Sequence, residues 1–341
     1  MNKHICKGNN AIKDALIQLG NTKVRTLIIV DNDNKVIGSL TDSDIRHALL
    51  SGVDTKESVC LIMNKNCVKY TVNNDDEFIP DEKRRLFLKK SNLNVVPVVN
   101  KDNLLLDLII KNKSIYSKTP VVIMCGGLGT RMGYLTKECP KPMLKVYGKP
   151  MLEIIIRQLS AERFKKIYLA INYLGEQIES YFGDGSNFGV EIKYIKEHKR
   201  MGTGGALSLI EDSIKSPILV MNGDIITDFD LRNLLDFHMQ SKSFATMAIS
   251  EHTIQNPFGV VKFDGAKFLD IDEKPIYKSY INSGVYAIEP GFLSMVPKDT
   301  FIDMPTLLSM AKEKSKKVLV YPIIESWVDV GRIADYERLN A

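Results

Sequence analysis

The sequence predicts an α/β protein in which a mostly parallel sheet, wrapped by helices, follows a smaller repeated module. From residue 120 onward, short apolar segments alternate with amphipathic helical patterns, as in parallel sheets joined by helical crossovers. Before residue 119, two similar stretches, Arg25–Gly38 and Asn94–Asp107, recur 69 residues apart. A length of 341 residues also favours two domains and a sizeable core.

The composition favours a globular protein without a nucleic-acid partner. Lys and Arg number 46 against 41 Asp and Glu, the formal net charge is +5, and no arginine-rich block occurs. Such evenly spread basicity suits substrates that carry phosphates. The N-terminus lacks the apolar core of a signal peptide and no apolar run reaches the length of a membrane span, so we expect a cytoplasmic protein without membrane attachment.

Each copy of the repeat reads as apolar strand, polar turn and apolar strand. Amphipathic helical patterns flank the copies at residues 11–19, 42–50 and 81–90. A short unit repeated twice indicates a pseudo-twofold pair, because neither copy could bury its sheet alone. We expect one copy at 1–57, a degenerate second copy at 58–118, a polar linker at 111–119 and the larger domain at 119–341.

The first copy continues as GSLTDSDIRHAL, in which Thr41 can cap a helix and Asp44 follows three positions later. This string, within a paired repeat, resembles the CBS domain, a module that pairs and often binds adenine nucleotides. The resemblance implies that Thr41 and Asp44 meet the ribose and phosphate side of a ligand; a capped helix without a ligand is the alternative. The second copy replaces Gly38, Thr41 and Asp44 with Asp107, Ile110 and Lys113, so at most one good site is expected.

The strongest functional signal is the stretch 121–145, which reads VVIMCGGLGTRMGYLTKECPKPMLK. A buried strand ends in glycines whose N–H groups can turn towards an anion, and Arg131 adds a guanidinium that grips phosphate oxygens in pairs. Lys141 lies between two prolines, so its backbone is stiff. The residues that we expect to hold the nucleotide here are Gly126, Gly127, Gly129, Thr130 and Arg131.

This stretch lacks the Lys-Ser/Thr ending of a Walker A loop and the glycine spacing of a dinucleotide-binding loop. The order GG, G, TR, PKPML and then GKP at Gly148–Pro150 resembles the signature of sugar-1-phosphate nucleotidyltransferases. The resemblance implies a Rossmann-like, mostly parallel sheet, a nucleoside triphosphate and a sugar 1-phosphate as substrates, and Mg²⁺ as cofactor. Strands are expected at residues 121–125, 167–171, 190–195, 218–221 and 244–249, with the site at their carboxyl ends.

A second glycine-rich loop, GTGG at 202–205, opens a helix after the third of these strands. We expect its N–H groups to face an anion or a base, and the family uses this loop to hold the nucleobase. Gly202 and Thr203 are the expected contacts. Glu197 can accept two hydrogen bonds from the N1–H and amino group of guanine, whereas pyrimidines would present a carbonyl to it. A solvated surface glutamate is the alternative.

Two acidic residues are the expected metal ligands. Asp224 follows a strand and a glycine in ILVMNGD, and Asp329 lies in ESWVDVGR. Carboxylates are suitable Mg²⁺ ligands, but only the resemblance implies that two residues so far apart converge.

The acceptor site is also implied by the resemblance. NPFGVVKFDGAKFLDIDEKP is a hairpin pattern that turns at Asp264 and Gly265 and ends in an EKP segment, which in the family binds the sugar phosphate. The residues assigned to this role are Gly259, Glu273, Lys274 and Asn282.

The inferred reaction is attack of a sugar 1-phosphate oxygen on the α-phosphorus of the triphosphate, with release of pyrophosphate. Arg131, Lys141, Asp224 and Asp329 are the expected catalytic residues, and no general base is needed because a phosphomonoester has a second pKa of about 6. A catalytically inactive, nucleotide-sensing regulatory subunit is the alternative from another class. The CBS resemblance also favours a homodimer or higher oligomer.

The CBS pair, the short transferase domain and Glu197 together resemble the guanylyltransferases of bacterial legionaminic acid and related surface-sugar pathways. GTP is therefore the expected donor and glucosamine 1-phosphate the leading acceptor. A mannose- or heptose-1-phosphate guanylyltransferase, or a UTP, dTTP or CTP donor, remains the alternative.

The second copy lacks the counterparts of Gly38, Thr41 and Asp44, and this loss leads to a testable expectation for ligand binding by the repeated module. Calorimetry should detect an adenine nucleotide at no more than one site per chain, and Asp44→Ala should weaken that binding. Two equivalent sites, or binding unchanged by the substitution, would contradict this interpretation.

Overall fold

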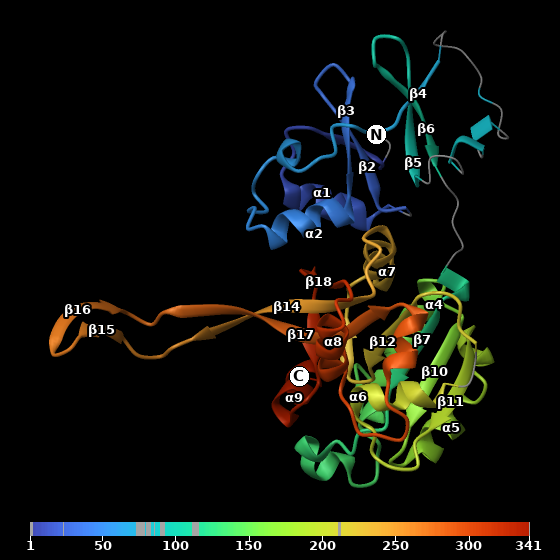
Figure 1. Cartoon of the computed structure of the whole chain (residues 1–341), viewed down its shortest axis with the longest axis vertical. Helices are drawn as coiled ribbons and strands as arrows, with labels where there is room; N and C mark the ends of the chain where they lie inside the picture. Colours follow the sequence, from blue (N-terminus) through green and yellow to red (C-terminus); the bar gives the residue numbers. More distant parts are fainter. Residues whose placement is uncertain are drawn as a thin grey trace. The chain divides into compact units, whose positions relative to one another are not determined.

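The computed structural model describes residues 3–22, 24–72, 79, 83–84, 86–88, 93–110, 116–210 and 213–340. The chain forms two compact units, Met1–Ser114 and Ile115–Ala341 (Figure 1). Within the described ranges, no helix is long and apolar enough to cross a membrane. The helix expected at 81–90 falls largely outside those ranges.

The first unit contains two three-stranded sheets of the same topology. In each sheet the first strand is parallel to the second, and the third is antiparallel to it. The ladders even share an irregularity, a register shift after Ile29 in one copy and after Val98 in the other. The elements are β1 (Ile5–Lys7), α1 (Ile12–Gly20), β2 (Thr26–Val30), β3 (Val36–Thr41), α2 (Asp42–Leu50), η1 (Val59–Leu61), β4 (Tyr70–Thr71), β5 (Val95–Val99) and β6 (Leu105–Ile110). The repeat deduced from the sequence is confirmed.

Reciprocal contacts join the two copies. The N–H of Leu105 donates to the carbonyl of Asn34 at 3.1 Å, and the N–H of Val36 donates to the carbonyl of Asn103 at 3.0 Å. Both asparagines have a φ of 65°, a left-handed conformation that Asn tolerates well. Apolar side chains from β2, β3, β5 and β6 share one core cluster. The pairing is therefore pseudo-twofold, as the repeat indicated.

Thr41 and Asp44 form a reciprocal cap at the start of α2. Asp44 Oδ2 accepts hydrogen bonds from Thr41 N at 2.8 Å and from Thr41 Oγ1 at 2.7 Å, and Asp44 N donates to Thr41 Oγ1 at 3.3 Å. These side chains thus satisfy backbone groups that a helix start leaves without partners. A ligand role for the same residues stays a prediction.

The second unit is built on a seven-stranded sheet in the order β11-β10-β7-β12-β17-β14-β18. Only β17 runs against its neighbours, so the expected mixed, mostly parallel sheet is confirmed, and strands occur at all five expected places. The strands of this sheet are β7 (Pro120–Met124), β10 (Lys166–Ile171), β11 (Glu191–Lys196), β12 (Ile218–Asn222), β14 (Ala245–Gln255), β17 (Ile276–Ile288) and β18 (Val318–Ile323). The smaller strands are β8 (Lys145–Val146), β9 (Lys149–Pro150), β13 (Ile225–Thr227), β15 (Val260–Asp264), β16 (Lys267–Asp272) and β19 (Trp327–Asp329).

Apolar side chains cover both faces of this sheet. In β7, Val121 and Ile123 belong to one core cluster and Val122 to another, because successive side chains of a strand point to opposite faces. The first cluster includes residues of α4, α5 and α7, and the second includes residues of α8 and η7. The helices are η2 (Tyr116–Lys118), η3 (Thr130–Thr136), η4 (Lys141–Met143), α4 (Met151–Ala161), α5 (Gly175–Phe182), η5 (Ser186–Phe188), α6 (Gly202–Gly205), η6 (Ala206–Leu209), α7 (Leu231–Gln240), η7 (Pro290–Met295), α8 (Met304–Glu313) and α9 (Ile333–Asn340).

Tyr116, near the end of the expected linker, packs into the second unit. Its ring lies 5.9 Å from that of Phe164, and its hydroxyl donates to Asp236 Oδ2 at 2.9 Å. The last residues of the polar stretch 111–119 therefore belong to the core of this unit rather than to a solvated connection.

Strands β14 and β17 continue beyond the sheet as a two-stranded arm, which β15 and β16 complete (Figure 1). The hairpin turns at Gly265 and Ala266, one residue later than the predicted Asp264 and Gly265, because Asp264 still pairs with Lys267.

His238 is a buried histidine of α7 with a structural role. Its Nδ1 lies 2.9 Å from Thr246 Oγ1 and 3.0 Å from Ser243 Oγ, and its Nε2 lies 3.2 Å from Glu289 Oε1. Burial lowers the pKa of His238 to about 4, so the ring is neutral at pH 7 and its contact with Glu289 is a hydrogen bond.

This histidine should make the protein less stable in acid. Between pH 6.5 and 4 the unfolded chain binds a proton at His238 that the folded chain does not, so the free energy of unfolding should fall by up to about 3 kcal/mol as pH drops through this range. The free energy of unfolding, measured with denaturant at several pH values, should depend less steeply on pH in His238→Gln than in the parent. The exposed His252→Gln should show the same pH dependence as the parent. Equal slopes for all three proteins would contradict a neutral buried ring.

Candidate active site

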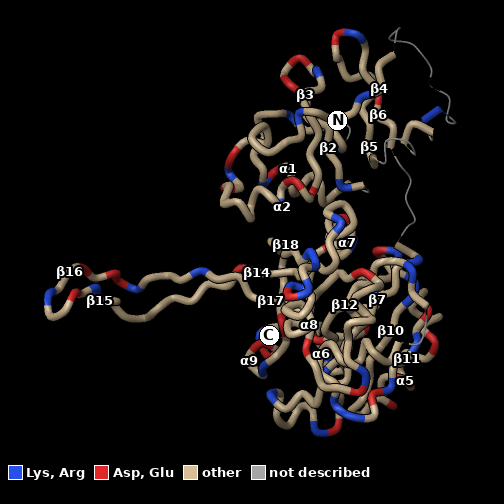
Figure 2. The backbone as a smooth tube through the Cα atoms, in the orientation of Figure 1, with Lys and Arg blue, Asp and Glu red and all other residues tan. Residues whose placement is uncertain are grey.

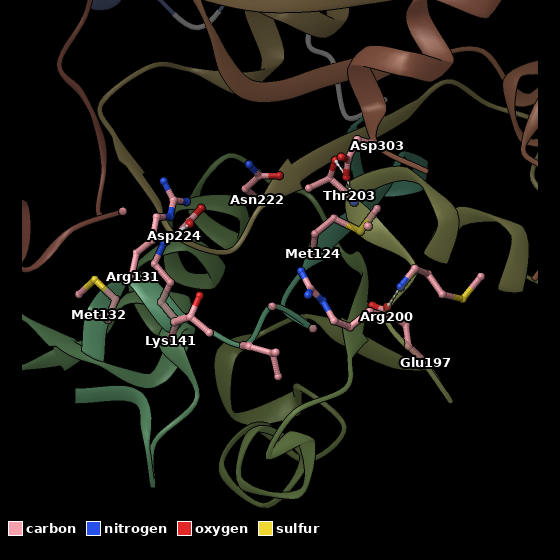
Figure 3. A pocket seen from close by; sticks show the side chains of 18 of the residues that line it. Met124, Arg131, Met132, Lys141, Glu197, Arg200, Thr203, Asn222, Asp224 and Asp303 are labelled. Atoms are coloured by element: carbon pink, nitrogen blue, oxygen red, sulfur yellow. Dashed lines mark hydrogen bonds and ion pairs between the residues drawn. The ribbon is translucent and has the colours of Figure 1, made fainter. Parts of the chain in front are cut away.

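A pocket of about 380 Å³ opens at the carboxyl ends of the parallel strands (Figure 3). The expected site residues that line it are Gly126, Gly127, Gly129, Thr130, Arg131, Lys141, Glu197, Gly202, Thr203 and Asp224. Figure 3 shows Arg131, Lys141 and Asp224 at one side and Arg200 and Glu197 at the other. The sequence prediction thus locates the two ends of one cavity.

A side chain at the first glycine of the loop after β7 would displace the carboxylate of Glu197. A Cβ on Gly126 would lie 2.5 Å from Glu197 Oε1. The loop leads directly into η3, which carries Arg131 on an exposed position beside the pocket. Backbone amides and an exposed guanidinium are therefore available to phosphate oxygens at this side.

Lys141 and Asp224 form a buried ion pair in the pocket wall. Lys141 Nζ donates to Asp224 Oδ2, and the two side chains are only 10% and 19% exposed. Pro140 and Pro142 flank the lysine, as the sequence shows. Gly223 N donates to Met124 O at 3.0 Å, so the strand that carries Asp224 lies against the strand that carries the glycine loop. The ion pair holds the ammonium beside the glycine loop.

Asp329 reaches Asp224 through backbone pairing of β13 with β19. Ile225 is opposite Asp329 in that ladder, and Val330 N donates to Asp224 O at 3.1 Å. One carboxylate oxygen of each aspartate, Oδ1, is buried without a hydrogen-bond partner. Burial, followed by the charge of Asp224, raises the pKa of Asp329. The two aspartates, whose spacing in the sequence did not predict that they meet, are therefore brought together by the fold.

These two carboxylates fit a magnesium ion. Two unsatisfied oxygens that repel each other are stabilised by a divalent cation, and Mg²⁺ commonly takes one or two carboxylates and completes its shell with waters and substrate phosphates. The described part of the chain contains no cluster of three or more His, Cys, Asp or Glu side chains suited to a metal. A pair of carboxylates is thus the donor set expected for a metal ion that also binds the phosphates of a substrate.

Glu197 forms the opposite end of the pocket. Its N–H donates to Ile171 O at 2.9 Å, which fixes its backbone to the end of β10, and its Oε2 accepts from Met201 N at 3.2 Å. Burial raises the pKa of Glu197. Its side chain is half-buried and directed to the pocket, so the alternative of a solvated surface glutamate is not what the structure shows.

Three of the four GTGG amides do not face the pocket as expected. Thr203 N donates to Asp303 Oδ1 at 3.0 Å, and the N–H groups of Gly204 and Gly205 both donate to Ile302 O at 3.0 Å. These three N–H groups therefore donate to the loop before α8, about a hundred residues later in the chain, and are not free for an anion. Gly202 and Thr203 still line the pocket.

The residues assigned to the sugar phosphate are not brought to the pocket. Gly259 and Glu273 adjoin each other, since a Cβ on Gly259 would lie 2.8 Å from Glu273 Oε2, but with Lys274 they lie on the arm outside the pocket lining. Asn282 lies at the base of the arm, where its Nδ2 donates to the hydroxyl of Tyr286 at 2.7 Å. Their acceptor role stays a prediction.

Sequence reasoning missed four polar or aromatic residues of the pocket lining, which are Arg200, Asn222, Phe301 and Asp303. Asn222 and Arg200 adjoin recognised motifs, so proximity could have identified them. Phe301 and Asp303 are held there by the hydrogen bonds to the GTGG loop, which no local pattern reveals.

Residues 120–341 match a family model described as nucleotidyl transferase, and residues 3–51 match the model of the CBS domain. A mannose-1-phosphate guanylyltransferase of Mycobacterium tuberculosis is 30% identical over 227 residues, which are 64% of this chain and 63% of the relative. A UTP–glucose-1-phosphate uridylyltransferase of Synechocystis is 29% identical over 235 residues, 63% of this chain and 61% of the relative.

A D-glycero-alpha-D-manno-heptose 1-phosphate guanylyltransferase of Campylobacter jejuni is 31% identical over 224 residues, which are 63% of this chain and 96% of the relative. Thus the chain spans about three fifths of the length of the first two relatives and nearly all of the third.

A solved structure from Bacillus anthracis, described as a glucose-1-phosphate thymidylyltransferase, superposes with a TM-score of 0.54 at 24% identity and covers 65% of this chain and 94% of that one. This similarity supports the fold of the second unit. With more than half of its length matched by the family model, the chain belongs to the nucleotidyl transferase family and carries a CBS domain at its N-terminal side.

Proposed function

We propose that this protein transfers GMP from GTP to a sugar 1-phosphate, forming a nucleoside diphosphate sugar and pyrophosphate. One observation carries the proposal: a single pocket has Arg131, Lys141 and Asp224 at one end and a half-buried glutamate at the other, and strand pairing brings Asp329 next to Asp224. The first end suits phosphates, and the second suits a base that donates hydrogen bonds. The names of the relatives agree with a sugar 1-phosphate as acceptor.

The basic residues align two anions that repel each other. The backbone of Gly126–Thr130 and the Arg131 side chain hold the departing pyrophosphate, while Lys141 binds the α-phosphate or the incoming phosphate. The acceptor phosphate is already ionised at neutral pH, since its second pKa is about 6, and it needs no base to activate it. Catalysis is then mainly alignment and charge neutralisation.

Asp224 and Asp329 would hold Mg²⁺, with their unpartnered Oδ1 atoms as the donors. When bound, the ion neutralises charge on the phosphates as the transfer proceeds. The ammonium of Lys141 balances the charge of the Asp224 carboxylate, so the two carboxylates can remain ionised together.

Guanine is the proposed base because Glu197 accepts hydrogen bonds. Its Oε2 is partly occupied by Met201 N, and its Oε1 faces the glycine loop. Guanine offers N1–H and an amino group to these oxygens, whereas the carbonyls of uracil or thymine would be repelled.

The proposed acceptor is a hexose or aminohexose 1-phosphate, with glucosamine 1-phosphate first and mannose or heptose 1-phosphate as alternatives. We also propose that the two CBS copies divide between residues 57 and 58, with an adenine nucleotide as regulatory ligand of the CBS module; the larger domain, expected from residue 119, begins at Ile115 in the structure. A regulatory subunit without activity is the competing function, and the presence of Arg131, Lys141 and Asp224 in one pocket, with Asp329 paired next to Asp224, argues against it.

Pyrophosphate release tests the reaction directly. GTP, UTP, dTTP and CTP would each be combined with glucosamine, glucose, mannose and heptose 1-phosphates in the presence of Mg²⁺. GTP with one of these acceptors should give the highest rate. If no pair yields pyrophosphate and a nucleoside diphosphate sugar, the transferase proposal fails.

Asp224→Asn and Asp329→Asn should each lower turnover by at least about a hundredfold, because each removes a charge worth several kcal/mol of transition-state stabilisation. The exposed Asp228→Asn is the matched control and should behave as the parent. Thermal unfolding would establish that all three variants fold. Turnover within tenfold of the parent for both site variants, at saturating Mg²⁺, would contradict the assignment.

Glu197→Gln should reduce the preference for GTP over the pyrimidine triphosphates, since an amide presents a donor to one side of the base and weakens two charge-assisted hydrogen bonds. The comparison is the ratio of kcat/KM values for GTP and UTP. Glu191→Gln, at the exposed start of β11, the strand that precedes Glu197, is the control. An unchanged ratio in Glu197→Gln would show that another group selects the base.

A further inference from the structure

The arm formed by residues 251–280 has no partner on either edge within the described structure. β14 pairs with β18 only as far as Ser250, and beyond that point β14 pairs with β17 alone. β15 and β16 pair only with each other. Figure 1 shows this two-stranded ribbon projecting away from the sheet. An isolated two-stranded ribbon is marginally stable in water, so this one requires a covering surface.

The arm also concentrates exposed apolar side chains. Of the 21 large hydrophobic residues exposed in the described chain, ten lie on it. They are Ile254, Phe258, Val261, Phe263, Phe268, Leu269, Ile271, Ile276, Tyr277 and Tyr280. Phe258 is 73% exposed and Phe263 69%. An apolar surface of this extent marks a site of protein association.

The charges of the arm favour a protein partner. Four lysines and five acidic residues lie along it, and both signs are visible in Figure 2. Several pair within the arm: Lys262 Nζ lies 2.8 Å from Asp272 Oδ2, and Lys278 Nζ lies 3.0 Å from Glu251 Oε1. A nearly neutral, internally paired surface does not attract nucleic acid or an anionic membrane.

The arm is directed away from its own body. The ladder between β14 and β17 is regular from Ile249 and Asn282 to Gln255 and Ile276, without a bulge that would bend it back. Glu273 and Lys274 follow this regular segment, roughly 20 Å along the ribbon at about 3.3 Å per residue. The irregular backbone begins only there, with Lys274 at a φ of 47°. A fold-back onto the same chain would need a bend where the ladder is continuous.

We propose that the arm docks on a second copy of this chain and completes that copy's acceptor site. Gly259, Glu273 and Lys274 lie on the arm, whereas Arg131, Lys141, Asp224 and Asp329 belong to the body, so the acceptor residues of one protomer are supplied to its partner. A twofold exchange makes the two docking surfaces identical and buries both arms at once. This inference rests on the proposed function for the roles of Glu273 and Lys274.

Heterodimers with one defect in each chain test the exchange. Lys274→Ala disables the arm and Asp224→Asn disables the body, and each variant should be inactive alone. The two chains would be co-expressed with different tags and purified through both. Exchange gives one complete site per heterodimer, formed by the Lys274→Ala body and the other chain's arm, and therefore about half of the parental turnover. A control heterodimer carries Lys267→Ala, near the tip of the hairpin, in place of Lys274→Ala. The Lys267→Ala homodimer should itself retain activity.

A heterodimer with no more turnover than the two inactive single-variant homodimers would show that the arm acts on its own chain, and would overturn the proposal. A second readout does not depend on activity. A photo-crosslinking amino acid at Phe258 in a mixture of ordinary and ¹⁵N-labelled chains should give crosslinked peptides of mixed isotope content that join the arm to the pocket face. Only same-isotope crosslinks, or a monomer in sedimentation at micromolar concentration, would also overturn it. If pyrophosphate is never released yet mixed crosslinks form, the proposed function fails and the exchange stands.

Discussion

The site depends on the parallel pairing of β7 with β12. In that ladder Met124 is opposite Asn222, so both strands end at the same edge of the sheet. The glycine loop leaves one strand there and Asp224 leaves the other, and the hydrogen bond from Gly223 N to Met124 O holds the two exits together. The ion pair between Lys141 and Asp224 then fixes the lysine beside the phosphate loop. A cation and an anion buried together cost far less than either alone, so the pair positions both.

The second aspartate depends on the same edge. The short antiparallel ladder of β13 and β19 begins directly after Asp224 and brings in a segment about a hundred residues away. Packing of Val330 and Met132 in one apolar cluster supports that approach. The result is a site whose carboxylates are held by backbone pairing while each keeps one oxygen without a partner. Such oxygens are costly in an apo protein and become useful once a cation and phosphates enter.

The features that the sequence predicts correctly are those with a local physical signal. Buried parallel strands are apolar runs, and the glycine loop is a run of glycines directly after one of them, so both were visible in the residues. The remaining features depend on pairing between distant segments. The GTGG amides were expected to face the pocket, but the carbonyl of Ile302 and the carboxylate of Asp303 accept hydrogen bonds from those of Thr203, Gly204 and Gly205. Likewise, the alternation of apolar and polar residues in the hairpin predicts two strands. It does not predict whether these strands pack on the body or extend from it.

A structure of the protein with Mg²⁺ and a non-hydrolysable GTP analogue tests the central claim most directly. Two ends of one pocket are assigned here, one to phosphates and one to guanine. The account predicts phosphates against the backbone of Gly126–Thr130 and the side chain of Arg131, a metal between Asp224 and Asp329, and the N1–H and amino group of guanine on Glu197. A nucleotide bound with its base away from Glu197, or with its phosphates distant from Arg131 and Lys141, would contradict it.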